Sequence, residues 1–265
     1  MPNEPTIQEL FDLNGKVALV TGATGHLGRS LAAALAEAGG TVICASRDEQ
    51  RALIAAEELP TPRGQNHTGV VLDHLNFAGA EHAFDAAAAT TGGIDIIIND
   101  AHEPLAEDLT TVAADQFNRQ LANATAYFLL ARKLRDHAVA RGKPASIVML
   151  GSMYGVVGSY PETYAEVCAA SPVAYHALKG GIIHMTRHLA VYWAKDGVRV
   201  NCLSPGPFPN PAAPLELRKR LTDKSPFGRL GVPHELKGAV LLLASDAGSY
   251  ITGQNLLIDG GWTAW

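Results

Sequence analysis

The chain has few of the features that bind metals, span membranes or attach to polyanions. Its 265 residues include three cysteines, Cys44, Cys168 and Cys202, at no metal-binding or disulfide spacing. That scarcity fits a reducing cytoplasm. The uninterrupted apolar runs are much shorter than the roughly 20 residues that cross a bilayer, so we expect no membrane partner. The N-terminal extension, residues 1–13, lacks the apolar stretch of a signal peptide.

Basic charge is also scarce. The net charge is −5 and the isoelectric point is near 6.0, which gives no reason to expect a nucleic-acid partner. The longest basic cluster, Arg218-Lys219-Arg220, is interpreted as the solvated face of a helix. Hydrophobic residues make up 47% of the chain, which is enough for a substantial core.

The order of apolar runs predicts the fold. Runs typical of buried strands occupy residues 16–21, 41–45, 70–72, 94–98, 146–150, 198–203 and 255–258. Helical stretches lie between them at 27–38, 48–59, 78–90, 114–140, 174–195 and 234–244. This alternation indicates an α/β fold of Rossmann type, a doubly wound parallel sheet with helices on both faces. Residues 1–265 are predicted to form one domain.

A glycine-rich turn follows the first predicted strand and precedes the first long helix. Glycines in this context let the backbone approach a pyrophosphate, which rests on amide groups at the helix N-terminus. The turn therefore predicts a dinucleotide site. Its residues are Gly22, Thr24, Gly25, His26, Leu27 and Gly28.

The end of the second predicted strand indicates which dinucleotide binds. Ser46 and Arg47 occupy it, and a guanidinium forms a forked, charge-assisted contact with a phosphate. We therefore favour NADP(H) over NAD(H). Asp48 leaves the alternative open, because an acidic residue here would accept hydrogen bonds from a ribose 2′-hydroxyl.

Tyr175 and Lys179 are four residues apart on a predicted helix, hence on one face. Acid–base work by a tyrosine at neutral pH needs a stabilised phenolate, which the charge of a neighbouring lysine supplies. The spacing alone is common. It becomes specific only with other motifs.

Those motifs occur in order along almost the whole chain, and together they resemble the classical short-chain dehydrogenase/reductase (SDR) family. They are the glycine turn, Asn99, Asn123, Ser152, Tyr175-x-x-x-Lys179, Ser204-Pro205-Gly206 and the ending 253–261. The resemblance implies a hydride-transferring oxidoreductase that acts on a carbonyl or secondary alcohol, and a homo-oligomer, either a tetramer or a dimer.

The resemblance also assigns roles. Tyr175 would be the general acid/base, and Lys179 would stabilise its phenolate and bind the nicotinamide ribose. Ser152 would hydrogen-bond the substrate oxygen, and Asn123 would hold a water in a proton relay. Further cofactor contacts are expected from Asp73 and His74 at the adenine, from Asn99 and Ala101 in the cleft, and from Pro205, Gly206 and Phe208 beside the nicotinamide.

Three departures from the family pattern are candidates for specificity. His26 stands where the turn usually has its second glycine, and His102 replaces a glycine beside the nicotinamide cleft. Ser152 and Tyr175 are separated by an inserted loop, residues 158–171, which is expected to lie over the active site or to serve as a flap or subunit contact. Candidate substrate contacts are His102, Met153, Tyr154, Tyr160 and Tyr164.

Three functions stay open on the sequence. The first is reduction or oxidation of a small polar or sugar-like compound, favoured by polar and aromatic residues in the inserted loop. The second is 3-oxoacyl thioester reduction, which would favour a more apolar flap. The third is an NADP(H)-binding sensor or scaffold without turnover, since His102 and the altered glycine turn depart from the usual cofactor geometry.

Overall fold

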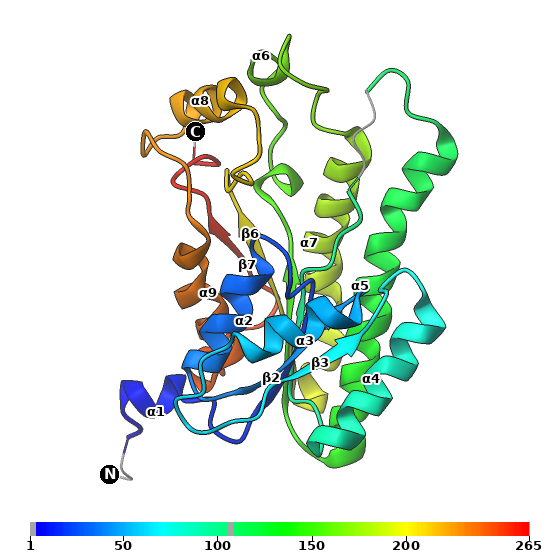
Figure 1. Cartoon of the computed structure of the whole chain (residues 1–265), viewed down its shortest axis with the longest axis vertical. Helices are drawn as coiled ribbons and strands as arrows, with labels where there is room; N and C mark the ends of the chain where they lie inside the picture. The colour runs from blue at the N-terminus through cyan, green and yellow to red at the C-terminus, as the bar shows by residue number, and fades with distance from the viewer. Residues whose placement is uncertain (1–3, 105–108, 265) are drawn as a thin grey trace.

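A computed structural model of the chain, whose residues 4–104 and 109–264 are described here, is built around one parallel sheet (Figure 1). Its strands are β1 (Val17–Thr21), β2 (Thr41–Ser46), β3 (Thr68–Val71), β4 (Ile96–Asn99), β5 (Ala145–Leu150), β6 (Val198–Pro205) and β7 (Asn255–Ile258). They lie in the order β3-β2-β1-β4-β5-β6-β7, and every neighbouring pair is parallel. The doubly wound α/β fold expected from the sequence is confirmed.

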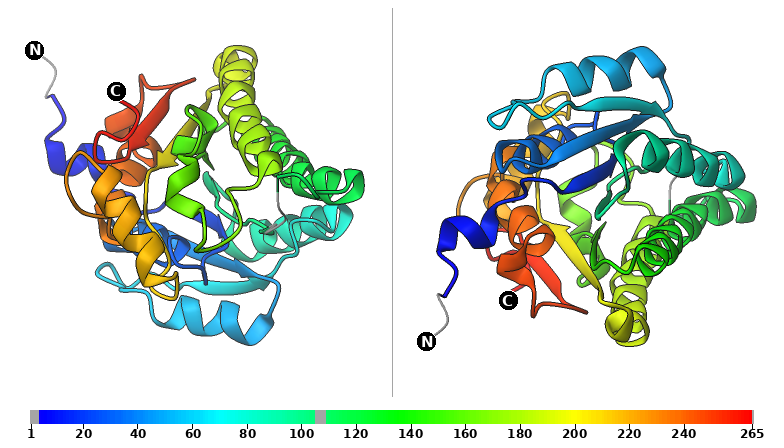
Figure 2. Two further views of the ribbon diagram at one scale, coloured as in Figure 1. Left: turned by 90° about the horizontal axis from the view of Figure 1, so that it is seen from above. Right: turned by 90° about the horizontal axis from the view of Figure 1, so that it is seen from below.

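Helices cover both faces of the sheet, as the end-on views show (Figure 2). One layer contains α2 (Gly28–Glu37), α3 (Glu49–Glu57) and α9 (Lys237–Ala244). The other contains α4 (Phe77–Thr91), α5 (Ala114–Arg141) and α7 (Val173–Trp193). Among the described residues, no helix is long and apolar enough to cross a membrane.

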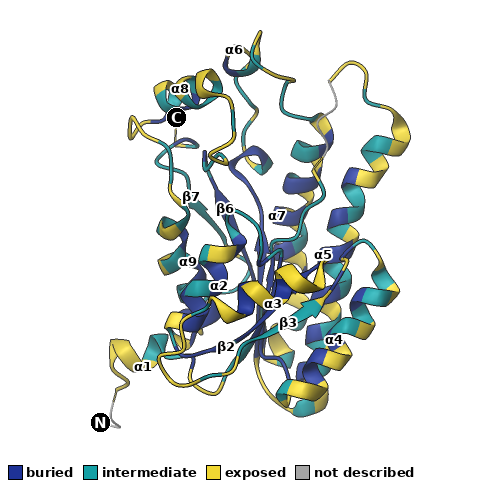
Figure 3. Ribbon diagram, viewed as in Figure 1, coloured by how far each residue is buried: buried dark blue, intermediate teal, exposed yellow. Residues whose placement is uncertain are grey.

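The two cores follow from the alternation of side chains along each strand. In β1, Leu19 faces the α4–α5–α7 layer, whereas Ala18 and Val20 face the other layer. Because both faces are covered, the strands are mostly apolar. The central strands β1, β2, β4, β5 and β6 are almost completely buried, whereas the edge strands β3 and β7 are only partly buried (Figure 3). Large buried side chains such as Phe84, 0% exposed, fill the space between sheet and helices.

The order of strands reverses between β1 and β4, because the chain leaves β3 at one edge and returns on the far side of β1. In open α/β sheets, ligands bind at the carboxyl ends of the strands at such a switch point. The amides of Asp100 and Ala101, just after β4, both donate to Thr21 Oγ1 at 3.0 Å. This pair of bonds joins the end of β1 to the loop after β4, on the two sides of the switch point.

Several elements differ from the sequence prediction. Strand β3 begins two residues earlier than predicted, and β6 extends two residues further, through Pro205. The N-terminal extension contains the short helix α1 (Ile7–Phe11), capped by reciprocal bonds between Thr6 and Glu9, while its residues 1–3 lie outside the described ones. The inserted loop contains the single turn α6 (Pro161–Tyr164), and the basic cluster lies on α8 (Leu215–Lys224).

Candidate active site

A cleft in two parts lies at the carboxyl ends of the strands. The larger part, about 770 Å³, is lined by Gly22, Thr24, Gly25, His26, Leu27, Ala45, Ser46, Arg47, Asp48, Arg51, Leu72, His74, Asp100, Ala101, His102, Pro104 and Asn210. The smaller part, about 500 Å³, is lined by His102, Pro104, Ser152, Met153, Tyr154, Tyr164, 168–172, Tyr175, 206–209 and Leu221. Since His102 and Pro104 belong to both, the two parts meet at these residues.

The glycine turn forms one wall of the larger part. Gly25 N donates to Gly22 O at 2.8 Å, and Gly22 has a φ of +71°, which favours glycine. A Cβ on Gly28, the first residue of α2, would collide with the carbonyl oxygen of Gly22. The turn thus has no room for a side chain at Gly22 or Gly28, and its backbone faces the cleft without side chains at these two positions. A dinucleotide fits this cradle, and the amides at the start of α2 would hold its pyrophosphate.

The end of β2 gives Asp48 a local structural role. The Asp48 carboxylate accepts a hydrogen bond from Arg51 N at 2.8 Å and caps α3. Its own amide donates to Ser46 Oγ at 3.2 Å. Arg47 and Arg51 both reach the cleft from here. One oxygen of this carboxylate therefore caps the helix, while Arg47, Asp48 and Arg51 all line the ligand space.

Tyr175 and Ser152 lie on the walls of the smaller part, and Lys179 lies behind Tyr175. The Lys179 ammonium is 5.6 Å from the centre of the Tyr175 ring and donates to Leu150 O at 2.7 Å. Ser152 Oγ accepts from Tyr154 N at 3.1 Å, which leaves its hydroxyl hydrogen free to donate. The end of β5 and the first turns of α7 thus bring together three of the four residues predicted as the catalytic set, Ser152, Tyr175 and Lys179.

Asn123 lies deeper, 1% exposed, and ties three segments together. Its Oδ1 accepts from Glu103 N at 2.9 Å and from His74 Nε2 at 2.8 Å, while its Nδ2 donates to Gln120 O at 2.8 Å. These bonds connect α5 to the loop after β4 and to the end of β3. The role of Asn123 in a water relay stays a prediction.

The inserted loop closes one side of the smaller part. Arg220 Nη1 on α8 donates to the carbonyl oxygens of Glu162 and Ala165, each at 2.8 Å, and Lys224 pairs with Glu162 at 2.7 Å. The basic cluster predicted as a solvated face thus includes an arginine that anchors the loop. These contacts hold α6 and α8 together at the top of Figure 1.

Tyr164 of the inserted loop meets Tyr154, which lies in the turn after β5. The hydroxyls of Tyr154 and Tyr164 are 2.6 Å apart, and burial raises the pKa of both phenols. Both line the smaller part of the cleft. Their role as substrate contacts stays a prediction. Tyr160 differs from the prediction. Its ring packs edge-on against Trp262, with centroids 5.6 Å apart, and lies under Lys224, so it contacts the C-terminal segment.

Other predicted residues are distributed as follows. The predicted cofactor residues that line the larger part are Gly22, Thr24, Gly25, His26, Leu27, Ser46, Arg47, His74 and Ala101. Gly206 and Phe208 line the smaller part, together with the predicted substrate residue Met153. Gly28, Asp73, Asn99 and Pro205 are not among the lining residues. Asp73 is exposed and accepts from Leu75 N, and the fully buried Asn99 donates to Tyr127 O.

The structure adds cleft residues that sequence reasoning missed. Arg51 lies in the first turn of α3, four residues after Arg47, and a second arginine so near the end of β2 could have signalled it. Asp100 lies on the floor of the larger part, where burial raises the pKa of its carboxyl to about 7, although the Lys179 charge opposes the shift. Asn210 reaches the cleft from the proline-rich segment after β6, and no sequence signal marked it.

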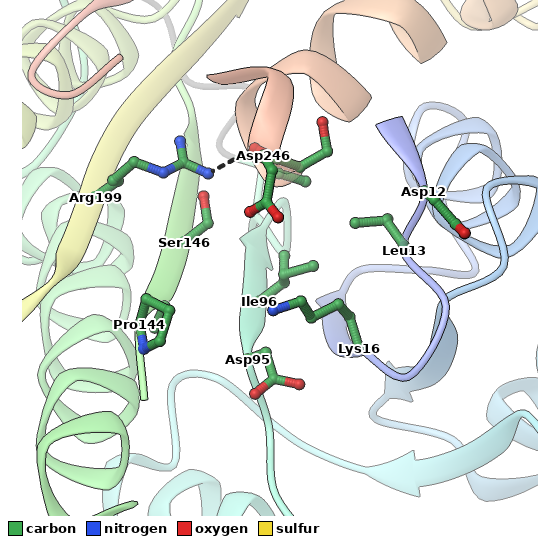
Figure 4. Close-up of a pocket in the computed structure, with 12 residues that line it drawn as sticks. Asp12, Leu13, Lys16, Asp95, Ile96, Pro144, Ser146, Arg199 and Asp246 are labelled. Atoms are coloured by element: carbon green, nitrogen blue, oxygen red, sulfur yellow. Dashed lines mark hydrogen bonds between the residues drawn. The ribbon is translucent and has the colours of Figure 1, made fainter. Parts of the chain in front are cut away.

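A separate hollow lies at the opposite edge of the sheet, at the amino ends of β4, β5 and β6 (Figure 4). Its volume of about 40 Å³ suits a few waters. Arg199 there donates to the carbonyl oxygens of Leu243 and Ser245, and Asp95 pairs with Arg141 at 3.0 Å. These charges are used in joining strands to helices, so the hollow is structural.

Comparisons with known proteins agree with this geometry. Residues 22–263 match a family model described as Enoyl-(Acyl carrier protein) reductase. The chain is 35% identical over 263 residues to a galactitol 2-dehydrogenase (L-tagatose-forming) from Cereibacter sphaeroides, covering 97% of this chain and 98% of the relative.

Among the solved structures with the same fold, two examples have bound nicotinamide cofactors of different kinds. One is a gluconate 5-dehydrogenase from Burkholderia cenocepacia in complex with NADP and tartrate, with 28% identity, a TM-score of 0.87, and coverage of 98% of this chain and 100% of the other. A short chain dehydrogenase from Leptospira borgpetersenii with bound NAD+ has 30% identity, a TM-score of 0.83, and coverage of 98% and 96%.

The fold, the glycine turn and the Ser152, Tyr175 and Lys179 arrangement define an oxidoreductase that uses a nicotinamide cofactor. The chain belongs to the classical short-chain dehydrogenase/reductase family.

Proposed function

We propose that the chain is an NADP(H)-dependent oxidoreductase that interconverts a secondary alcohol and a carbonyl group on a small polyol, sugar or sugar acid. The observation that carries the proposal is the connection between the smaller and the larger part of the cleft. The pocket with Ser152 and Tyr175 opens at His102 into the cleft lined by the glycine turn. A substrate carbon beside Tyr175 is thus next to the space for a nicotinamide, which supplies or accepts the hydride when bound.

Each member of the catalytic set has a defined task in this proposal. In reduction, Tyr175 gives its phenolic proton to the substrate carbonyl oxygen, and in oxidation it takes the hydroxyl proton back. The Ser152 hydroxyl donates to the same oxygen and stabilises its developing charge. Lys179, fixed by its bond to Leu150 O, stabilises the phenolate and has further N–H groups for a ribose hydroxyl.

The preference for NADP(H) rests on the residues after β2. A ribose 2′-hydroxyl would be recognised by a free carboxylate, but Asp48 is engaged as the cap of α3. Arg47 and Arg51 provide positive charge at the position where a 2′-phosphate would lie. The gluconate 5-dehydrogenase of the same fold was solved with NADP.

The size and lining of the smaller part support a hydroxyl-bearing substrate. Four residues that carry a hydroxyl group, Ser152, Tyr164, Ser171 and Tyr175, line this part of about 500 Å³. The galactitol dehydrogenase and gluconate dehydrogenase similarities point to the same class of compound.

A second candidate, 3-oxoacyl thioester reduction, is favoured by one feature of the same pocket. Part of its wall is apolar and could contact an acyl chain. The residues of this apolar part are Met153, Ala169, Ala170, Pro172 and Leu221.

A substrate panel tests the proposal. Purified protein is assayed with NADP+ against galactitol and gluconate, and with NADPH against L-tagatose and an acetoacetyl thioester. Turnover of a polyol, sugar acid or ketose, with kcat/KM at least about tenfold above that of the thioester, supports the proposal. Turnover of the thioester alone would establish the second candidate instead.

We further propose that the chain forms a homo-oligomer, either a tetramer or a dimer, through α5 and α7. Val191 and Tyr192 on α7 are 77% and 62% exposed, beside a surface hollow of about 460 Å³ lined in part by Phe128 and Trp193. Exposed apolar patches of this kind mark protein contacts. Light scattering should show Tyr192→Asp as a smaller species than wild type, whereas Tyr250→Asp, at another exposed tyrosine, keeps the wild-type mass.

A cytoplasmic location is also proposed. Cys44, Cys168 and Cys202 are all free thiols, and Cys168 is exposed. Free exposed thiols persist in a reducing compartment. Fractionation of cells that carry a tagged chain would test this.

A further inference from the structure

His102 occupies the junction of the two parts of the cleft and has no role in the proposed catalytic set. It lines both parts, and its ring lies edge-on to that of Tyr175, with centroids 5.4 Å apart. Any substrate whose oxygen is bonded to Tyr175 therefore comes close to this imidazole. The classical SDR pattern has a glycine at this position, so the imidazole of His102 is a departure of this chain from the family pattern.

The neighbour of His102 fixes which ring nitrogen carries the proton. Gln120 Nε2 lies 3.3 Å from His102 Nε2, and Gln120 is 2% exposed. An amide nitrogen only donates, so His102 Nε2 accepts and the ring proton resides on Nδ1. Burial, together with the Lys179 charge, lowers the pKa of His102 to about 3, so the ring is neutral under ordinary assay conditions.

The remaining nitrogen of His102 is available to a ligand. Within residues 4–104 and 109–264, the structure gives Nδ1 no hydrogen-bond partner, and Nδ1 is not among the fully buried polar atoms that lack one. Since the ring lines the cleft, Nδ1–H is a donor that a bound molecule can reach.

We propose that His102 Nδ1–H donates to a second substrate oxygen, on the carbon next to the one served by Ser152 and Tyr175. The substrate class is then a vicinal diol and its α-hydroxy carbonyl product. Oxygens on neighbouring carbons are about one hydrogen-bond length apart, so one can bond to Tyr175 while the other reaches the adjoining imidazole. The donor is neutral, so it recognises a hydroxyl group without requiring a charged substrate. This inference rests on the proposed function and narrows its substrate.

A matched pair of ketones tests the inference. Reduction of 3-hydroxy-2-butanone and of 2-butanone with NADPH is measured for the wild type and for His102→Phe, which keeps a ring but removes the N–H. Wild type is expected to favour the hydroxyketone by at least about tenfold in kcat/KM, because a site that hydrogen-bonds a hydroxyl discriminates against its absence. In His102→Phe the ratio of the two kcat/KM values should fall toward one.

Two additional variants separate recognition from packing. Gln120→Leu removes the amide that fixes the tautomer and should also reduce the ratio, whereas His184→Phe, at an exposed histidine on α7, should keep the wild-type ratio. NADPH affinity is measured by fluorescence for every variant. If His102→Phe retains the ratio, or weakens NADPH binding and both reductions equally, His102 is a packing residue and the inference is overturned.

The same assay distinguishes the inference from the function on which it rests. A wild type that reduces both ketones with a ratio near one contradicts only the role of His102. A wild type that oxidises no NADPH with either ketone, and fails on the polyol and ketose panel as well, contradicts both.

Discussion

Replacing Arg47 with alanine should weaken the use of NADPH much more than the use of NADH. Arg47 follows the last residue of β2 and lines the cleft beside Arg51. In the described parts of the chain, neither guanidinium is in an ion pair, so each is available to a phosphate. Asp48 points its carboxylate at the N-terminus of α3 and does not neutralise them.

The size of the effect follows from the exposure of the site. A hydrogen bond to a charged group contributes about 1.5–3 kcal/mol. Both arginines are exposed, and solvent screening weakens such contacts. We therefore expect about 1–2 kcal/mol from Arg47, which corresponds to about a 5- to 30-fold loss in kcat/KM for NADPH. NADH lacks the 2′-phosphate, and its kcat/KM should change by less than about twofold.

The assay is steady-state reduction of one ketose with each cofactor. Arg51→Ala should produce a loss of the same kind, and Arg47→Ala combined with Arg51→Ala a larger one. Arg29→Ala is the matched control, because it removes the same charge from α2, where Arg29 lies 3.7 Å from Glu58 on the surface. An equal loss for NADPH and NADH, or no loss for either, would refute the assignment of the 2′-phosphate to this position.

Three further predictions concern stability and the inserted loop. Because the folded-state pKa of Asp100 is raised from 3.8 to about 7, its stability contribution is present below about pH 4 and is lost as the pH rises to 7. Between pH 4.5 and 8, wild type should therefore lose roughly 2 kcal/mol of unfolding free energy that Asp100→Asn does not lose, as measured by urea denaturation. This is about half the value for a fully buried carboxyl, because Asp100 lines an open cleft. Phe84→Ala should cost about 3–5 kcal/mol in the same assay, because the ring is 0% exposed. Arg220→Ala should raise substrate KM severalfold with little change in kcat and speed proteolysis within residues 158–171, because it removes two anchoring bonds.

Each of these has a clear contrary result. A pH dependence of stability that is the same in Asp100→Asn and wild type would place the raised pKa elsewhere. A loss below about 1 kcal/mol for Phe84→Ala would mean that the α4 side of the core is loosely packed. Unchanged proteolysis of Arg220→Ala would show that the loop is held by other contacts.

The fold and the meeting of Ser152 and Tyr175 in one pocket could be predicted because local patterns determine them. Apolar runs that alternate with helices specify a parallel sheet, and consecutive elements carry Ser152 and Tyr175 to the same edge. The glycine turn could be predicted equally well. A Cβ on Gly28 would collide with Gly22 O, so this backbone conformation requires glycine and is visible as a glycine pattern in the sequence. Strand ends were less certain, because pairing with a neighbouring strand extends β3 and β6 beyond their apolar runs. The added residues are Thr68 and Gly69 in β3 and Ser204 and Pro205 in β6.

The inserted loop could not be predicted in the same way, because contacts distant in sequence determine it. Arg220 and Glu162 are 58 residues apart, and nothing local indicates that the guanidinium will bond to this carbonyl group. Tyr160 and Tyr164 are both aromatic residues of one loop. The single turn of α6 between them directs Tyr164 toward the cleft and Tyr160 toward Trp262. The tertiary position of the C-terminal segment therefore decides which tyrosine contacts a ligand.

The role of Tyr175 as general acid/base is tested most directly by Tyr175→Phe. NADPH binding and ketose reduction are measured on the same preparation. We predict that the variant binds NADPH within about threefold of the wild-type Kd, because Tyr175 lines the smaller part of the cleft and not the part with the glycine turn. Its kcat should fall by about 10²–10⁴-fold. A variant that reduces the ketose at the wild-type rate would contradict the account.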